Sequence, residues 1–186
     1  MLKRFTIKQI VFLALVGALL FVTDLVLSTG IDAATGILGA GYLITSLFFV
    51  LIATLGGLIV RKFWTYTIMA LIYAVLTVPT PVLGPPGAYK IVLGILLGLI
   101  ADLIVFLFKY KKPGYYLALM VANVLSLIFS YYALIILGLP GADQLKDYLV
   151  FFSLWYAFTA FLGSGIAIFL YERKVKNMRL VQQIGD

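Results

Sequence analysis

The chain has 186 residues, of which 64% are hydrophobic and only 11% are charged, and its mean hydropathy is +1.15. Soluble domains have roughly 45–50% apolar and about 25% charged residues, so most of this surface must face something other than water. A membrane-spanning helix needs about 20 apolar residues, so the chain has room for six or seven spans in one domain, 1–186. It contains no cysteine and no histidine, which excludes disulfides, the common zinc sites and Ser-His-Asp catalysis.

Six long, continuous apolar runs predict an all-α integral membrane protein, a compact bundle of six transmembrane helices. We expect the first run to be a span rather than a cleaved signal peptide, because such peptides have an apolar core of about 7–15 residues. The third run is short and contains several hydroxyl groups. The expected spans cover 9–28, 42–60, 64–78, 89–108, 115–137 and 148–171.

The basic residues alternate with these spans. Twelve of the fourteen lysines and arginines lie in the N-terminal segment, the C-terminal tail and the connections that follow the second and fourth spans. The other three connections contain only Lys90 and Lys146. The positive-inside rule then places both termini in the cytoplasm and predicts a multi-pass protein of the cell membrane, surrounded by the lipid bilayer. A basic surface divided in this way does not match nucleic-acid binding, so no nucleic-acid partner is expected.

The expected outer connections, 31–41, 79–87 and 138–146, are longer than the inner ones and rich in glycine and proline. Long connections on one side of a compact bundle are where binding usually occurs.

Two expected spans have small residues at steps of four. Ala14 and Ala18 lie on one face of the first span, where they allow another helix to approach closely, either a partner's helix or one of this bundle. Lys90, Gly94, Gly98 and Asp102 follow one broad face of the fourth span. A carboxylate in a span should face protein or water. Asp102 is therefore either a coupling or ligand group or a helix-end carboxylate that reaches Lys109 or inner-loop water.

The fifth span has a polar seam, in which Asn123, Ser126 and Ser130 share a face with Tyr116 and should point inward. Aromatic residues follow one face of the sixth span, where they either stack on a flat ligand or serve as packing. Aromatic faces, hydroxyls and one cation suit a flat, neutral or mildly anionic small molecule. The candidate ligand residues, all near the outer ends of spans four to six, are Tyr89, Lys90, Ser130, Tyr131, Tyr148 and Trp155.

The opening TIKQIVFLALVGALLF, with Ala14-x-x-x-Ala18 after a basic start, resembles the substrate-binding S-component of energy-coupling factor (ECF) vitamin transporters. Size, six helices, cytoplasmic termini, a long first outer loop and the loop GPPGAYK are also similar. The resemblance implies that the chain captures a small water-soluble vitamin from outside for ATP-driven uptake. It also implies that Ala14 and Ala18 dock against a transmembrane coupling subunit, which works with a pair of ATPase subunits.

The residues leave other functions open. No Gly-Lys-Ser/Thr phosphate loop occurs, so ATP hydrolysis would belong to partners. The alternatives are a structural or assembly-factor membrane protein of similar topology and a membrane enzyme such as a lipid-modifying transferase. Only Asp24 and Asp102 are acids within spans, and they form no paired-carboxylate motif. We therefore expect no enzymatic activity, no catalytic residues, no metal site and no cofactor.

Overall fold

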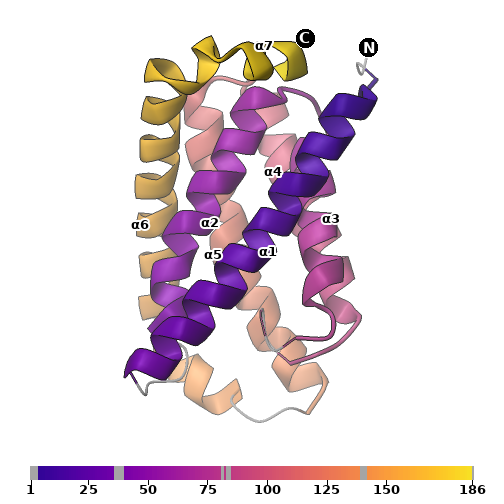
Figure 1. The fold of residues 1–186 in the computed structure, drawn as a ribbon. Helices are drawn as coiled ribbons and strands as arrows, with labels where there is room; N and C mark the ends of the chain where they lie inside the picture. The colour runs from indigo at the N-terminus through magenta and orange to yellow at the C-terminus, as the bar shows by residue number, and fades with distance from the viewer. Residues whose placement is uncertain (1–3, 36–39, 81, 83–84, 139–141, 186) are drawn as a thin grey trace.

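The computed structural model describes residues 4–35, 40–80, 82, 85–138 and 142–185, and in these ranges the chain forms helices and no strand. Figure 1 shows the long helices side by side in a bundle, with both termini at the same end. The elements are α1 (Ile7–Thr35), α2 (Ala40–Ile59), α3 (Thr65–Thr77), α4 (Tyr89–Leu107), α5 (Lys112–Ile136), α6 (Ala142–Arg173), the 3₁₀ turn η1 (Val175–Asn177) and α7 (Arg179–Gly185).

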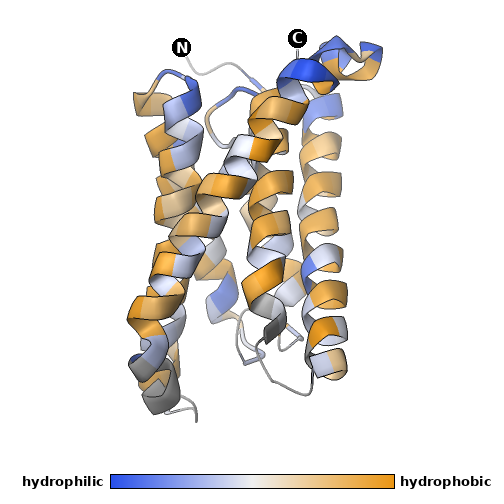
Figure 2. Ribbon diagram, turned by 90° about the vertical axis from the view of Figure 1, so that its left-hand side faces the viewer, coloured by the Kyte–Doolittle hydropathy of each residue, from blue (hydrophilic) through white to orange (hydrophobic). Residues whose placement is uncertain are grey.

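The apolar character predicted from composition follows the lengths of these helices, and hydrophilic residues gather chiefly at the end that carries the termini (Figure 2). We call this the basic end, because the turns after α2 and α4 bring their lysines and arginines there. Two apolar stretches, Leu43–Ile59 and Thr65–Thr77, are shorter than a usual span. Four described segments are long and apolar enough to cross a bilayer, Ile7–Thr35, Tyr89–Leu107, Lys112–Ile136 and Tyr148–Asn177. An α-helical, multi-pass membrane architecture is therefore confirmed.

Several boundaries differ from those expected. Helix α1 continues past Gly30 to Thr35, and α6 begins at Ala142, so the first and third outer connections are shorter than predicted. A single glycine inside a helix costs only about 1 kcal/mol relative to alanine, so Gly30 does not end α1. Residues 36–39 and 139–141 of these connections lie outside the described residues. The C-terminal tail, which the sequence analysis treated only as a basic segment, folds into η1 and α7 and lies across the basic end (Figure 1).

Helices α3 and α4 pack together at very close range. A Cβ atom added at Gly94 would lie 2.6 Å from the Ala74 Cβ, and one added at Gly98 would lie 2.5 Å from the Thr67 Cα. Any side chain at these two positions would push the helices apart. The prediction that these glycines permit a close helix approach is confirmed, and the partner is α3 of the same chain.

The first turn of α3 is capped by a side chain from α4. Trp64 precedes α3 in a left-handed conformation, with φ 79°, and its side chain makes no capping hydrogen bond. Asp102, which is 2% exposed, takes this role. Its Oδ1 accepts from the Tyr66 N–H at 3.0 Å, and its Oδ2 accepts from the Thr67 N–H at 2.9 Å and the Thr67 hydroxyl at 2.8 Å. Asp102 thus satisfies backbone donors that have no partner within the helix.

The other end of α3 is held by Lys90, at the start of α4. The Lys90 side chain is fully buried, and its Nζ donates to the carbonyls of Thr77 at 3.0 Å, Thr80 at 2.7 Å and Val82 at 2.6 Å. An ammonium group has three donors, and all three are used. Lys90 therefore fixes the last carbonyl of α3 and the chain that follows it.

We predict that Asp102→Ala destabilises the protein by about 3 kcal/mol, because buried backbone donors left without acceptors cost about 1–3 kcal/mol each. The midpoint of thermal unfolding in mild detergent, followed by intrinsic fluorescence, should fall by roughly 6–12 °C. Glu172→Ala is the matched control, since Glu172 is an exposed carboxylate that pairs with Lys112. Equal shifts for the two variants would show that Asp102 is not the cap.

Lys90→Met keeps most of the unbranched side chain and removes its three donors. We expect it to lower the unfolding midpoint by a similar amount, because the buried Val82 carbonyl and the partly buried Thr80 carbonyl lose their partner. Lys146→Met, at an exposed position near the same end of the bundle, should change the free energy of unfolding by less than about 0.5 kcal/mol. A stable Lys90→Met protein would contradict this structural role.

Candidate functional site

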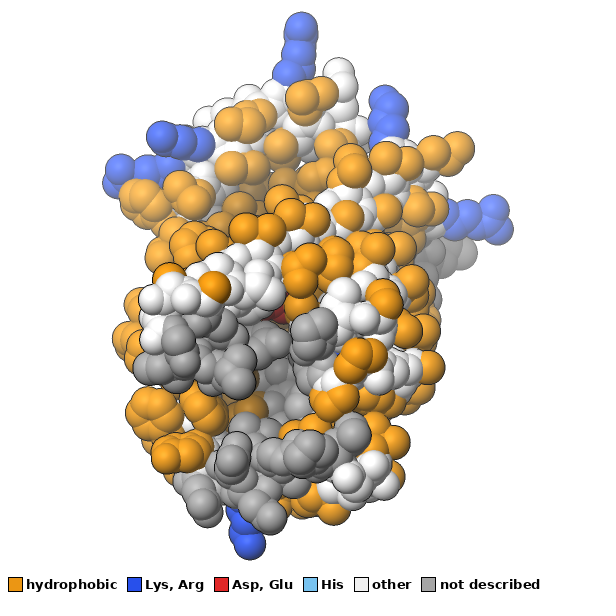
Figure 3. Space-filling view, turned by 60° about the horizontal axis from the view of Figure 1, so that its bottom comes forward, with side chains coloured by type: hydrophobic (Ala, Val, Ile, Leu, Met, Phe, Trp, Pro, Cys, Tyr) orange, Lys and Arg blue, Asp and Glu red, His pale blue; other side chains and the backbone are white. Residues whose placement is uncertain are grey.

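A cavity of about 300 Å³ lies inside the bundle, and each of the helices α1 to α6 contributes to its lining. Figure 3 looks toward the end of the molecule remote from the basic end and shows a hollow there, with acidic atoms visible inside it. Most of the lining is apolar, and the nine polar residues are Asp24, Thr45, Ser46, Tyr66, Tyr73, Asn123, Ser126, Ser130 and Tyr156. A cavity of this size and character is typical of a small-molecule site.

Asp24 of α1 places a carboxylate in the cavity. Its side chain is 7% exposed, and its Oδ2 accepts a hydrogen bond from the Tyr73 hydroxyl of α3. The Thr45 hydroxyl of α2 is a second hydrogen-bond partner. Two bonds do not fill the four acceptor positions of a carboxylate, so Asp24 is able to accept further bonds from a bound molecule.

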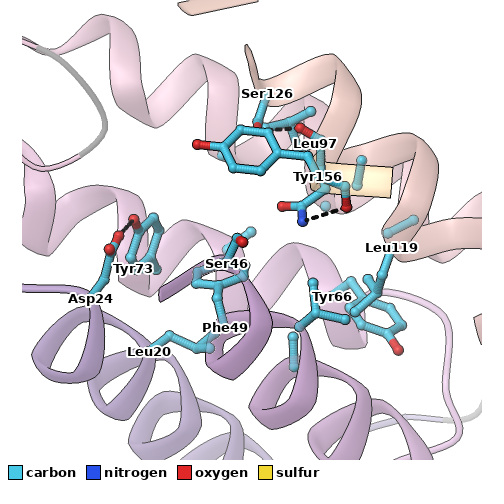
Figure 4. Close-up of a pocket in the computed structure, with 18 of the residues that line it drawn as sticks. Leu20, Asp24, Ser46, Phe49, Tyr66, Tyr73, Leu97, Leu119, Ser126 and Tyr156 are labelled. Carbon is cyan, nitrogen blue, oxygen red and sulfur yellow. Dashed lines mark hydrogen bonds between the residues drawn. The ribbon is translucent and has the colours of Figure 1, made fainter. Parts of the chain in front are cut away.

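A pair of aromatic rings lies on one side of this carboxylate. The rings of Phe49 and Tyr73 meet edge to face, with centroids 5.1 Å apart and an interplanar angle of 72°. Figure 4 shows Tyr73 facing Asp24 at one side of the cavity, whereas Tyr66 and Leu119 lie at the other side. Ring edges and faces next to a carboxylate suit a flat ligand that has both apolar surface and a polar group.

The opposite wall carries neutral hydrogen-bonding groups from α5 and α6. Asn123, Ser126 and Ser130 of α5 all line the cavity, so the prediction that this seam faces the bundle interior is confirmed for these three residues. The Ser126 hydroxyl donates to the Asn123 carbonyl at 2.7 Å, and the Asn123 amide donates to the Tyr156 carbonyl at 3.5 Å. The long Asn123 bond leaves the amide available to a ligand.

The electrostatic character of the cavity is acidic. Asp24 is the only charged residue among the lining residues that the structure describes, and neither lysine nor arginine is present there. A carboxylate in an apolar surrounding attracts hydrogen-bond donors and positive charge far more strongly than it does in water. The cavity therefore favours a ligand with a donor or cationic group over an anionic ligand.

Of the six candidate residues from the sequence, only Ser130 lines the cavity. Lys90 bonds to three backbone carbonyls near the end of α3, as described above. The Tyr89 hydroxyl donates to the Pro85 carbonyl at 2.9 Å. The expectation of a neutral or mildly anionic ligand depended on a cation at this place, and the cavity does not contain that cation.

The three remaining candidates lie elsewhere on α5 and α6. The Trp155 indole donates to the Leu43 carbonyl at 2.8 Å and so joins α6 to α2. Tyr131 lies against Tyr132, with ring centroids 5.4 Å apart, and the Tyr148 side chain is 59% exposed. A role for these residues in ligand binding stays a prediction.

Sequence reasoning did not include Asp24 among the ligand candidates. A carboxylate within an apolar span was the available signal, because such a group should face protein or water. Tyr73, which bonds to Asp24, and Phe49, which packs on Tyr73, could not be singled out from the sequence. Aromatic residues are frequent throughout this chain.

Ala14 and Ala18 are half-buried and lie on α1 beside an exposed apolar stripe. The stripe includes Leu15 and Val22, which are 65% and 51% exposed. Neither alanine lines the cavity. The face is open to lipid or to another protein, and docking of a partner there stays a prediction.

Comparison with known proteins identifies a family. The model of the family described as the permease component of an ABC-type cobalt transport system matches residues 7–142. The matched segment covers α1 to α5 and therefore nearly all of the cavity lining. Comparisons with curated proteins and with solved structures gave no match.

Proposed function

The chain belongs to the family of permease components of ABC-type cobalt transport systems, and we propose that it is the substrate-binding S-component of an ECF-type transporter. In this role it captures a small water-soluble molecule of vitamin size from outside the cell, and partner subunits use ATP to drive uptake. The observation that carries the proposal is the Asp24 cavity, which is lined by all six long helices, together with the hollow at the end remote from the basic end (Figure 3).

The proposed topology has six spans with both termini in the cytoplasm. Helix α3 and the apolar stretch Leu43–Ile59 of α2 are shorter than a usual span, yet each packs along longer helices, α2 on α1 and α6, and α3 on α1 and α4. The positive-inside rule assigns the basic end to the cytoplasm, so the hollow in Figure 3 would face the outside. This orientation gives an extracellular ligand access to Asp24.

The donor set of the cavity fits an organic ligand better than a cobalt ion. Divalent cobalt is held in proteins by imidazole, thiolate and carboxylate groups. The chain has no histidine or cysteine, and the described residues contain no group of three or more potential ligands among His, Cys, Asp and Glu. One carboxylate among aromatic rings and hydroxyls instead suits a flat organic molecule with a hydrogen-bond donor or a positive charge.

We also propose that the chain is not an enzyme. The lining that the structure describes has a single carboxylate and no lysine, so it lacks the paired acid and base of common hydrolytic mechanisms. A structural or assembly factor of similar topology is the remaining alternative, and a bound small molecule distinguishes it from a transport component.

The first test is mass spectrometry of small molecules released from protein purified in mild detergent, followed by titration of the identified compound. We expect a vitamin-sized compound with a donor or cationic group. Asp24→Asn should weaken its binding roughly ten- to hundred-fold, because a hydrogen bond to a charged group contributes about 1.5–3 kcal/mol. Glu172→Gln, a carboxylate change at the basic end, should leave the affinity unchanged. A purified protein that binds Co²⁺ and no organic compound would refute the proposal.

The second test concerns docking to the coupling subunit. Ala14→Trp should block a close approach of a partner helix and abolish co-purification with the coupling subunit and uptake, while ligand binding by the isolated protein persists. Leu19→Trp is the matched control, since Leu19 is 51% exposed on another face of α1. Intact co-purification of the Ala14→Trp protein would show that the partner docks elsewhere.

A further inference from the structure

A second cavity, of about 450 Å³, lies at the basic end, between the end of α2, the end of α6 and α7. It is separate from the Asp24 cavity, and the two share no lining residue. Its polar side chains come from Arg61, Tyr171, Lys176 and Gln182. The function proposed above makes no use of this cavity.

Two cations in this cavity, Arg61 and Lys176, form no salt bridge among the residues that the structure describes. The Arg61 Nε donates to the Leu58 carbonyl at 3.1 Å, and the guanidinium carbon lies 5.5 Å from the centroid of the Tyr171 ring. These contacts orient the guanidinium and leave its terminal amino groups for another acceptor. Glu172 is the nearest acid along α6, and it is already paired with Lys112 at 2.6 Å. Lys176 also interacts electrostatically with Glu172, but among the described residues neither Arg61 nor Lys176 forms a salt bridge and no acid lines the cavity, so its described lining is positively charged.

One wall of this cavity is α7, which is fixed to the bundle. The Gln9 side chain is fully buried and donates from its Nε2 to the Ile184 carbonyl at 2.7 Å. The Gln9 Oε1 accepts from the Lys62 Nζ at 2.7 Å, and Val181 packs with Ile184 against the core. The cavity thus has a defined shape rather than a wall made by a loose tail.

Two apolar side chains of this region are exposed among its basic ones. Met178 and Leu180, at the start of α7, are 53% and 73% exposed. Exposed apolar residues beside cations are typical of segments that lie at the headgroup boundary of a membrane. A phosphate group at Arg61 and Lys176 would then have its acyl chains beside these residues.

We propose that this cavity binds the phosphate of an anionic phospholipid in the leaflet at the basic end. Arg61 offers a planar pair of donors that matches two phosphate oxygens, and Lys176 adds a second positive charge. Basic cavities between helices at the cytoplasmic side of membrane proteins commonly hold such headgroups. The site is independent of the transported ligand.

The test titrates the full-length protein, purified in neutral detergent, with phosphatidylglycerol and separately with phosphatidylcholine. Native mass spectrometry counts the bound lipids. We expect one saturable phosphatidylglycerol site, with weaker binding of phosphatidylcholine. Arg61→Gln with Lys176→Gln should reduce the phosphatidylglycerol affinity roughly 10- to 30-fold. Lys111→Gln is the control for charge, because Lys111 is exposed at the same end and does not line the cavity.

Three outcomes would overturn the proposal. The double variant could bind phosphatidylglycerol like the wild type, or Lys111→Gln could weaken binding as much, which would indicate diffuse attraction rather than a site. Displacement of the lipid by millimolar inorganic phosphate would identify free phosphate as the occupant. The single variant Lys176→Gln is the control for misfolding, because the Lys176 side chain makes no hydrogen bond or salt bridge among those described. The unfolding midpoint of this variant should match that of the wild type.

Discussion

Helix α3 is held at both ends by charged side chains of α4, and the rest of the bundle depends on this clamp. Asp102 binds the N-terminal donors of α3, and Lys90 binds the carbonyls at its C-terminal end. The two residues are twelve positions apart on α4, which is roughly 18 Å along a helix, and α3 with its 13 residues is about 20 Å long. The signs also match the helix dipole, because a carboxylate is favourable at an N-terminus and a cation at a C-terminus.

The clamp explains how so short a helix forms one wall of a binding site. Gly94 and Gly98 let α4 approach α3 until only backbone and small side chains separate them. Rotation or sliding of α3 would break bonds at both ends, so the direction of Tyr73 toward Asp24 is fixed (Figure 4). Asp102 and Lys90 are buried charges, which are costly in an apolar medium. By fixing α3, they also fix the Tyr73 hydroxyl that bonds to a third buried charge, Asp24.

The sequence was sufficient for the helical architecture, for the close approach at Gly94 and Gly98 and for the inward seam of Asn123, Ser126 and Ser130. These features follow from composition and from residues that recur on one helix face. The partners of buried charges did not follow, because periodicity gives the face of a residue and not the neighbouring helix that this face meets. Lys90 was thus a ligand candidate, whereas its acceptors in the structure are backbone carbonyls, which no side-chain pattern encodes. Helix α7 was missed because seven residues are too few to show a period.

The short length of α3 has a consequence for the surrounding membrane. A hydrocarbon core is about 30 Å thick, so a helix of about 20 Å is too short to cross it. Tilting the helix would shorten its reach across the bilayer further. The chain after α3 occupies part of this depth, and irregular backbone is stable there only because the Lys90 ammonium takes the place of water at its carbonyls. In the proposed six-span topology, the lipid beside α3 adapts through hydrophobic mismatch, by local thinning or by the choice of shorter acyl chains. Bilayer thickness would act on the Asp24 site through this one helix.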